Sequence, residues 1–275
     1  MPKIPLTQLK KLADIQRWLG KIGENFVEFL ENAGAISILL WETLKTAFTT
    51  PLRWKAFLEQ SHKVGVSSLP LVMLTSLFTG MVLALQSSYQ LRLFSAEQFT
   101  SDLVSLSVTR ELGPVLTAMM VAGRVGASMA AELGTMKVTE QIDALKSLAA
   151  DPVRYLIVPR FLATVAMVVL LTIYADLVGM FGGYIVGVFK LGIGSYKYVN
   201  RTVDVLIMKD IYTGLIKAFF FGIIIAIVSC YFGFKTRGGA EGVGQATTLA
   251  VVVSFILIII FDTFFTGFFY LVFPS

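Results

Sequence analysis

The sequence has almost none of the residues from which metal sites and hydrolytic centres are built. It contains one cysteine, Cys230, and one histidine, His62, among 275 residues. An intramolecular disulfide, a Cys-based metal site and a histidine cluster are therefore excluded. No Ser-His-Asp set, HExxH motif or paired-carboxylate site is present, so we do not expect enzymatic activity in this chain.

Charge is also scarce. Charged residues make up 15% of the chain and hydrophobic residues 56%, and the mean hydropathy is +0.76. Soluble domains carry about 25% charged and about 45–50% apolar residues, so the composition predicts an all-α membrane protein. At roughly 20 residues per crossing, the length allows about five or six spans and no soluble domain of useful size.

A phosphate-binding loop is missing as well. The glycine-rich stretch at residues 238–244 lacks the lysine and the hydroxyl residue of a G-x-x-x-x-G-K-[ST] motif. We expect no cofactor in this chain, and any ATP and Mg²⁺ would be bound by a partner. The net charge of +5 reflects membrane topology, and we expect no nucleic-acid partner.

Five apolar segments are long enough to cross a bilayer. The first is free of charge throughout, and the third is the longest. The predicted spans are residues 64–86, 103–131, 155–189, 211–234 and 246–273.

Residues 1–60 precede the first span and predict interfacial helices. A basic amphipathic pattern is followed by a short apolar segment at 35–48 that Glu42 and Lys45 interrupt. Such helices lie on the membrane surface or dock on the body of the protein, and the pattern fits both. The apolar positions of the first helix are Leu9, Leu12, Ile15, Leu19, Ile22, Phe26 and Phe29.

Lysine and arginine counts predict the orientation. With the N-terminus inside, fifteen of these residues lie on the cytoplasmic side and five on the other. The positive-inside rule therefore favours a cytoplasmic N-terminus and, with five spans, a periplasmic C-terminus.

Four ionisable residues within the predicted spans are candidates for function: Arg110, Glu111, Lys217 and Asp262. Charged side chains inside a bilayer are costly and usually face a bundle interior or a cavity. The alternatives are a structural ion pair and, for Lys217, a side chain that reaches back to the membrane surface.

A short amphipathic helix is predicted at residues 137–150, between spans two and three. One face is apolar, and Asp151-Pro152 ends the helix. A helix of this kind suits docking to a cytoplasmic motor subunit, although it could equally lie flat on the bilayer. Its apolar face consists of Val138, Ile142, Leu145 and Leu148.

The central block of the chain resembles the MlaE/YrbE-type permeases of the Mla/Mce lipid-transport ABC systems. The similarity extends from the N-terminal helices to the end of the fifth span. The motifs that carry it are Arg110-Glu111-Leu112-Gly113-Pro114, Ala122-Gly123-Arg124-Val125-Gly126-Ala127, Ala131-Glu132-Leu133-Gly134, Thr139 to Leu145, Asp151-Pro152 and Pro159-Arg160.

The resemblance implies a bacterial inner-membrane permease that maintains outer-membrane lipid asymmetry. It implies a homodimer with two copies of a cytoplasmic ABC ATPase, a periplasmic MCE-domain ring and a small accessory subunit on the ATPase. The dimer would enclose phospholipid, whose transport ATP hydrolysis in the partner drives.

The resemblance also assigns residues to roles. The predicted lipid-binding set is Met81, Leu85, Gln86, Arg110, Glu111, Leu112, Lys217 and Asp262. The predicted ATPase-coupling set is Glu140, Gln141, Ile142, Asp143, Leu145 and Leu148. Leu249 stands where some relatives carry an arginine, so a basic headgroup contact is not expected there.

Two other functions fit parts of the sequence. An ion-coupled secondary transporter or channel would use Glu111 and Asp262 as a proton path, and would be expected to show internal repeats. A non-transporting scaffold would leave the charges within the spans without a role. Only the ABC hypothesis requires an ATPase partner in equal copy number.

Overall fold

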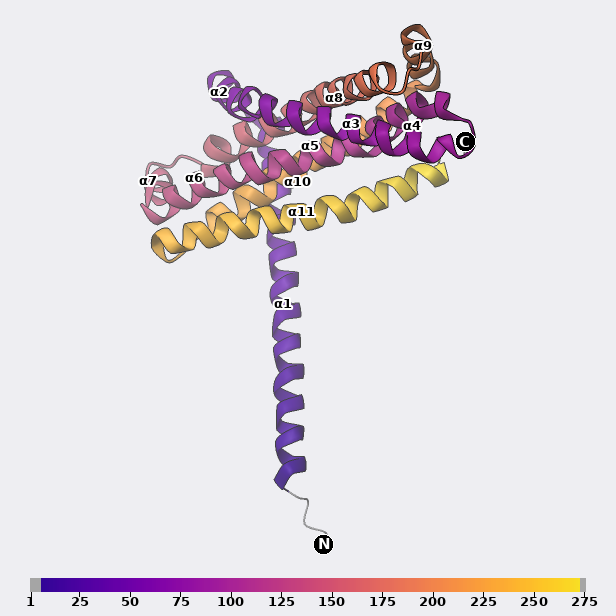
Figure 1. The fold of residues 1–275 in the computed structure, drawn as a ribbon. Coiled ribbons are helices and arrows are strands. Elements are labelled where there is room, and N and C mark those ends of the chain that lie inside the picture. The colour runs from indigo at the N-terminus through magenta and orange to yellow at the C-terminus, as the bar shows by residue number, and fades with distance from the viewer. Residues whose placement is uncertain (1–5, 273–275) are drawn as a thin grey trace.

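The computed structural model describes residues 6–272, and for residues 6–22, 25, 26 and 29 it describes the backbone alone. All regular structure in this part of the chain is helical (Figure 1). The helices are α1 (Leu6–Thr49), α2 (Trp54–Val64), α3 (Leu69–Arg92), α4 (Thr100–Ser107), α5 (Gly113–Val121), α6 (Ala127–Val138), α7 (Gln141–Ser147), α8 (Val158–Phe189), α9 (Ser195–Val205), α10 (Met208–Lys235) and α11 (Gly239–Val272).

Five helical stretches in the described residues are long and apolar enough to cross a membrane, as predicted. Each begins earlier than the sequence pattern indicated, because polar residues extend the helices beyond their apolar centres. Phe273, at the end of the predicted fifth span, lies outside the described residues. The stretches are Trp54–Arg92, Glu97–Val138, Val153–Phe189, Met208–Lys235 and Gly239–Val272.

The second span is interrupted by two π-helical segments, η3 (Val108–Leu112) and η4 (Ala122–Gly126), which separate α4, α5 and α6. Pro114 follows η3 in the first turn of α5, where its missing N–H disturbs the regular hydrogen-bond ladder. Such π segments occur frequently at functional sites. Each segment here carries an arginine, Arg110 in η3 and Arg124 in η4.

Small residues allow the spans to approach closely. A Cβ atom on Gly80 of α3 would lie 1.9 Å from the carbonyl oxygen of Gly179 in α8, so the two backbones are in direct contact. The central core draws on all five spans and includes Val72 of α3, Val121 of α5 and Phe221 of α10. By contrast, α3 and α11 keep much of their apolar surface uncovered: only 28% and 17% of the most apolar windows of their spans are buried.

The N-terminal helix α1 is continuous across both predicted segments and runs across the bundle, with its first half projecting away (Figure 1). No proline interrupts residues 6–49, so the chain has no strong helix breaker where the two segments meet. Leu39 and Leu44 in the second half of α1 pack against buried residues of α8 and α10 such as Phe161 and Ile227. The side chains of the predicted amphipathic face up to Ile22, and those of Phe26 and Phe29, lie outside the described residues.

The short helix α9 was not predicted from the sequence. It covers the end of the bundle away from α7 (Figure 1). Tyr198 is buried in the groove that Gly183 and Gly187 leave on α8. Arg201 forms an ion pair with Asp102 of α4, with 2.7 Å between Nη2 and Oδ2. This end of the bundle is therefore held by an aromatic contact and an ion pair.

Candidate functional site

The η3 segment places Arg110 beside the start of α10. The guanidinium donates from Nε to Oδ1 of Asp210 at 2.8 Å, and Nη2 lies 2.6 Å from the same oxygen. Asp210 is 1% exposed and its second oxygen accepts the Ile207 N–H, so the carboxylate also caps the helix. This pairing fixes the orientation of the Arg110 guanidinium, and 46% of the side chain remains accessible.

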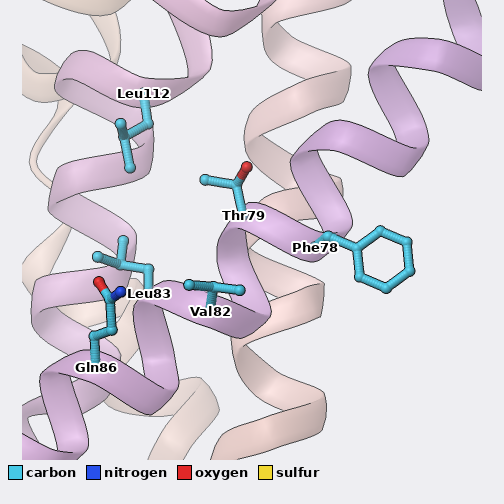
Figure 2. Close-up of a pocket in the computed structure, with 6 residues that line it drawn as sticks. All are labelled: Phe78, Thr79, Val82, Leu83, Gln86 and Leu112. Atoms are coloured by element: carbon cyan, nitrogen blue, oxygen red, sulfur yellow. The ribbon is translucent and has the colours of Figure 1, made fainter.

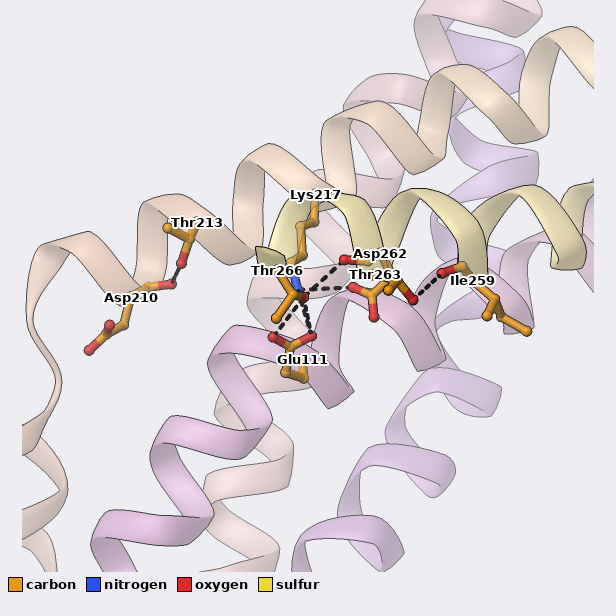
Figure 3. Close-up of polar contacts among 8 residues, drawn as sticks. All are labelled: Glu111, Asp210, Thr213, Lys217, Ile259, Asp262, Thr263 and Thr266. Atoms are coloured by element: carbon orange, nitrogen blue, oxygen red, sulfur yellow. Dashed lines mark hydrogen bonds and ion pairs between the residues drawn. The ribbon is translucent and has the colours of Figure 1, made fainter. Parts of the chain in front are cut away.

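Lys217 lies at the centre of a second polar cluster (Figure 3). Its ammonium donates to Glu111 Oε2 at 2.5 Å and to Thr266 Oγ1 at 2.7 Å, and forms an ion pair with Asp262 Oδ1 at 2.9 Å. The Lys217 side chain is only 2% exposed. The structure therefore shows a buried ion-pair cluster at this position instead of a lysine that reaches the membrane surface.

The two clusters line one pocket of about 180 Å³ between span two, α10 and α11. Ligand pockets typically measure about 300–1,000 Å³, so this pocket suits a headgroup-sized moiety. A guanidinium has five N–H donors, and Asp210 takes two of those of Arg110, which leaves donors for an anion. Glu111 is partly exposed and can accept from a cation, so the pocket can hold groups of both signs.

The structure also has an apolar groove of about 320 Å³. It is lined by one face of α3, including Val82, Leu83 and Gln86, and by Leu112 from η3 (Figure 2). The same π segment thus contributes Leu112 to the apolar groove and Arg110 and Glu111 to the polar pocket. The groove and the pocket share one helical segment.

The predicted lipid-binding residues are distributed over these two regions. Gln86 and Leu112 line the apolar groove, and Leu85 lines a shallow pocket further along α3. Met81 is partly buried against a small core with Ala84 and Val108. The four charged residues Arg110, Glu111, Lys217 and Asp262 meet in or beside the polar pocket.

Three polar residues that sequence reasoning missed accompany this set. Asp210 and Thr266 complete the two clusters. The sequence feature that could have identified Asp210 is the charged pair Lys209-Asp210 at the start of a span. For Thr266 it is the position one helical turn after Asp262. Asp176 of α8 is buried, and Oδ1 has no hydrogen-bond partner in the described part of the chain. A Cβ on Gly113 would lie 1.8 Å from this oxygen, so a glycine is required there.

The predicted coupling region forms a turn and a short helix. Glu140 has a positive φ of 61°, which separates α6 from α7. Ile142 is 1% exposed and faces the body of the protein, Leu145 is half-buried and Leu148 is 78% exposed. Gln141 and Asp143 are exposed, so Leu148, just after α7, is the predicted coupling residue with the most exposed apolar side chain.

The side chain of Lys137 connects α6 to α7. Its ammonium donates to both carboxylate oxygens of Asp143, at 3.1 and 2.8 Å. This hydrogen bond lowers the pKa of Asp143 below its usual value. Within the described residues, no group of three or more His, Cys, Asp or Glu side chains is arranged to hold a metal ion.

The sequence of the chain is similar to those of known membrane permeases. The family profile described as Permease MlaE matches residues 57–268. A probable ABC transporter permease protein of Rickettsia felis is 45% identical over 90% of this chain and 96% of the relative.

Two named relatives are more distant. The intermembrane phospholipid transport system permease protein MlaE of Haemophilus influenzae is 36% identical over 92% of this chain and 97% of the relative. The chloroplastic protein TRIGALACTOSYLDIACYLGLYCEROL 1 of Arabidopsis thaliana is 36% identical over 86% of this chain and 67% of its own length. The chain belongs to the MlaE permease family.

Proposed function

We propose that this chain is the membrane permease subunit of an ABC transporter that moves phospholipids, with ATP hydrolysis supplied by a partner. The observation that carries the proposal is that η3 contributes both to an apolar groove, through Leu112, and to a charged pocket, through Arg110 and Glu111. A diacyl lipid has the same division into apolar tails and a charged headgroup. The printed name of the Haemophilus relative supports phospholipid as the substrate.

The headgroup would bind through charges of both signs. The free N–H groups of Arg110 would donate to the lipid phosphate, and the exposed edge of Glu111 would accept from an amine when the headgroup carries one. Lys217 and Thr266 would hold Glu111 in place, and Asp262 pairs with Lys217. The acyl chains would lie along the face of α3 that carries Val82 and Gln86, where contacts are apolar and loose.

The polar pocket of about 180 Å³ accommodates a headgroup and not the acyl chains, which suits a homodimer whose second copy helps to cover them. The largely uncovered apolar faces of α3 and α11 suit contact with a second copy and with acyl chains. The complete transporter would add two copies of a cytoplasmic ATPase docked at α7, a periplasmic MCE-domain ring and a small accessory subunit on the ATPase. Its place would be a bacterial inner membrane, where it would maintain the lipid asymmetry of the outer membrane.

The proposed orientation has the N-terminus in the cytoplasm and the C-terminus in the periplasm. The excess of lysine and arginine at the α7 end of the spans supports it. We propose that α1 lies in the cytoplasmic membrane interface, since it runs across the spans and packs through Leu39 and Leu44. A helix that crosses the spans at a steep angle lies close to the membrane plane.

Purification in a mild detergent followed by mass spectrometry tests this function. We expect an ATPase in equal copy number, an MCE protein and bound phospholipid. Glu111→Lys should assemble normally but retain much less lipid, because it places two ammonium groups beside each other. A lipid-free oligomer that conducts ions would contradict the proposal and favour a proton path through Glu111 and Asp262.

A further inference from the structure

A second polar pocket lies on span two, further along the chain towards α7. Its volume is about 230 Å³, and it lies between α2 and the η4 and α6 segments. Arg124 and Arg110 are fourteen positions apart, which corresponds to about 20 Å along a helix at 1.5 Å per residue. The two pockets are therefore separate sites on the same span.

The charged residues around this pocket are mostly cations. Glu132 accepts from Lys63 and from Arg160, each at 3.1 Å, and its charge is shared by both. Arg124 lines the same pocket and is exposed. The pocket lining thus holds two cations, Arg124 and Lys63, and one carboxylate, Glu132, which Arg160 also neutralises. This excess of positive charge favours an anion.

Arg124 differs from Arg110 although both lie in π segments of one span. Arg110 is neutralised by the buried Asp210. For Arg124, the described side chains provide neither an ion pair nor a hydrogen bond. An arginine within an apolar span is costly unless its charge is matched, so a counter-ion from outside the chain is expected.

The remaining lining fits a phosphate that is attached to an apolar molecule. Ser67 and Ser128 bring hydroxyl groups to the pocket, and Val125 and Met129 bring apolar surface. Hydroxyl and guanidinium donors are typical ligands of phosphate oxygens. The apolar lining suits the glycerol and first acyl carbons of a lipid better than a hydrated free anion.

We propose that the pocket around Arg124 is a second phospholipid site, which binds the headgroup phosphate in the membrane leaflet nearest α7. This assignment rests on the proposed function, and it adds a lipid position distinct from the Arg110 pocket. Arg124 and Lys63 would contact the phosphate, and Ser67 and Ser128 would donate to it. Each chain would then hold two phospholipids, one at each pocket.

Native mass spectrometry of the full-length chain in detergent tests the proposal. The probes are dioctanoyl phosphatidylglycerol, dioctanoylglycerol and inorganic phosphate, titrated against wild-type protein, Arg124→Gln and Arg110→Gln. We expect two phosphatidylglycerol molecules per wild-type chain. Each variant should lose one, with affinity at the altered pocket reduced about tenfold or more, as expected for the loss of a charge-assisted hydrogen bond.

Controls separate charge from fold. Arg237→Gln removes an exposed arginine from the loop between α10 and α11 and should bind as wild type does. Arg124→Lys keeps the charge and should restore most of the binding. If Arg124→Gln does not fold, Lys63→Gln alters the exposed wall of the same pocket and should weaken the second lipid several-fold.

Four results would overturn the assignment. Unchanged binding by Arg124→Gln, with loss only in Arg110→Gln, would remove the second site and leave the proposed function intact. Equal binding of inorganic phosphate would identify a free anion as the ligand, and a changed oligomeric mass would indicate that a second copy covers Arg124. No bound phosphatidylglycerol on the wild-type protein would contradict the proposed function as well.

Discussion

Lys217 and Lys63 both pair with a glutamate of span two, but their surroundings differ. Lys217 contacts two carboxylates and a threonine hydroxyl and is 2% exposed, whereas Lys63 pairs with Glu132 at the edge of an open pocket and is 58% exposed. Arg110 and Lys217 of the first pocket are matched by Asp210, Glu111 and Asp262, whereas the cations of the second pocket exceed their acid partner, Glu132. The ion pairs of the Arg110 pocket fix its geometry, whereas those of the Arg124 pocket leave positive charge available for a ligand.

The largest expected effect is on stability. Lys217→Met should destabilise the protein by about 3–5 kcal/mol, because it leaves Glu111 and Asp262 close together without their cation. Lys63→Met, at an exposed pair, should cost less than about 1 kcal/mol. Thermal unfolding in detergent measures both, and equal losses would contradict the distinction. Adding Glu111→Gln to Lys217→Met should recover part of the loss.

The second effect concerns the direction of Arg110. Asp210→Asn should reduce phospholipid binding about tenfold to a hundredfold, because the guanidinium loses the buried charge that holds it. Asp102→Asn is the matched control, since it weakens a similar pair with Arg201 outside the pocket. Retained lipid, quantified after purification, is the readout. Similar losses in both variants would show that Arg110 needs no such positioning.

The third effect concerns binding of the ATPase at the exposed surface beside α7. Leu148→Asp should reduce the amount of ATPase recovered in a pull-down by at least about tenfold, because it places a charge on the exposed apolar side chain at the proposed ATPase contact. Leu93→Asp, in the turn after α3, has the same 78% exposure and should have no effect on recovery. Undiminished recovery with Leu148→Asp would place the ATPase contact elsewhere.

The smallest effect is the pH dependence of the Lys137–Asp143 pair. The hydrogen bond from Lys137 lowers the pKa of Asp143 in the folded protein. Its stabilisation is therefore fully present above the ordinary aspartate pKa, and is lost as pH falls through the lowered value. The stability difference between wild type and Asp143→Asn should shrink at acidic pH. A difference that grows as pH falls would contradict the assignment.

The spans could be predicted from the sequence because apolar length alone determines them. The pattern also identified Arg110, Glu111, Lys217 and Asp262, since charge within apolar runs is conspicuous. The ends of the spans were less accurate, because polar residues such as those of α2 continue the helices beyond the apolar centre.

Partner choice within the site could not be predicted from the sequence. Arg110 and Glu111 are adjacent and both pair with α10, but with residues seven positions apart, Asp210 and Lys217 respectively. Pairings between residues about one hundred positions apart depend on how the spans pack, which periodicity does not encode. The burial of Ile142 and the exposure of Leu148 likewise depend on how α7 docks.

Site-specific photocrosslinking tests most directly whether the groove and the charged pocket bind one phospholipid. Benzoylphenylalanine at the position of Val82 would report lipid in the apolar groove, and at Leu177, exposed on α8, it would report surrounding bilayer lipid. We predict that Glu111→Lys strongly reduces the phospholipid adduct at position 82 and leaves that at position 177 unchanged. Equal adducts at position 82 with and without Glu111→Lys would contradict the account.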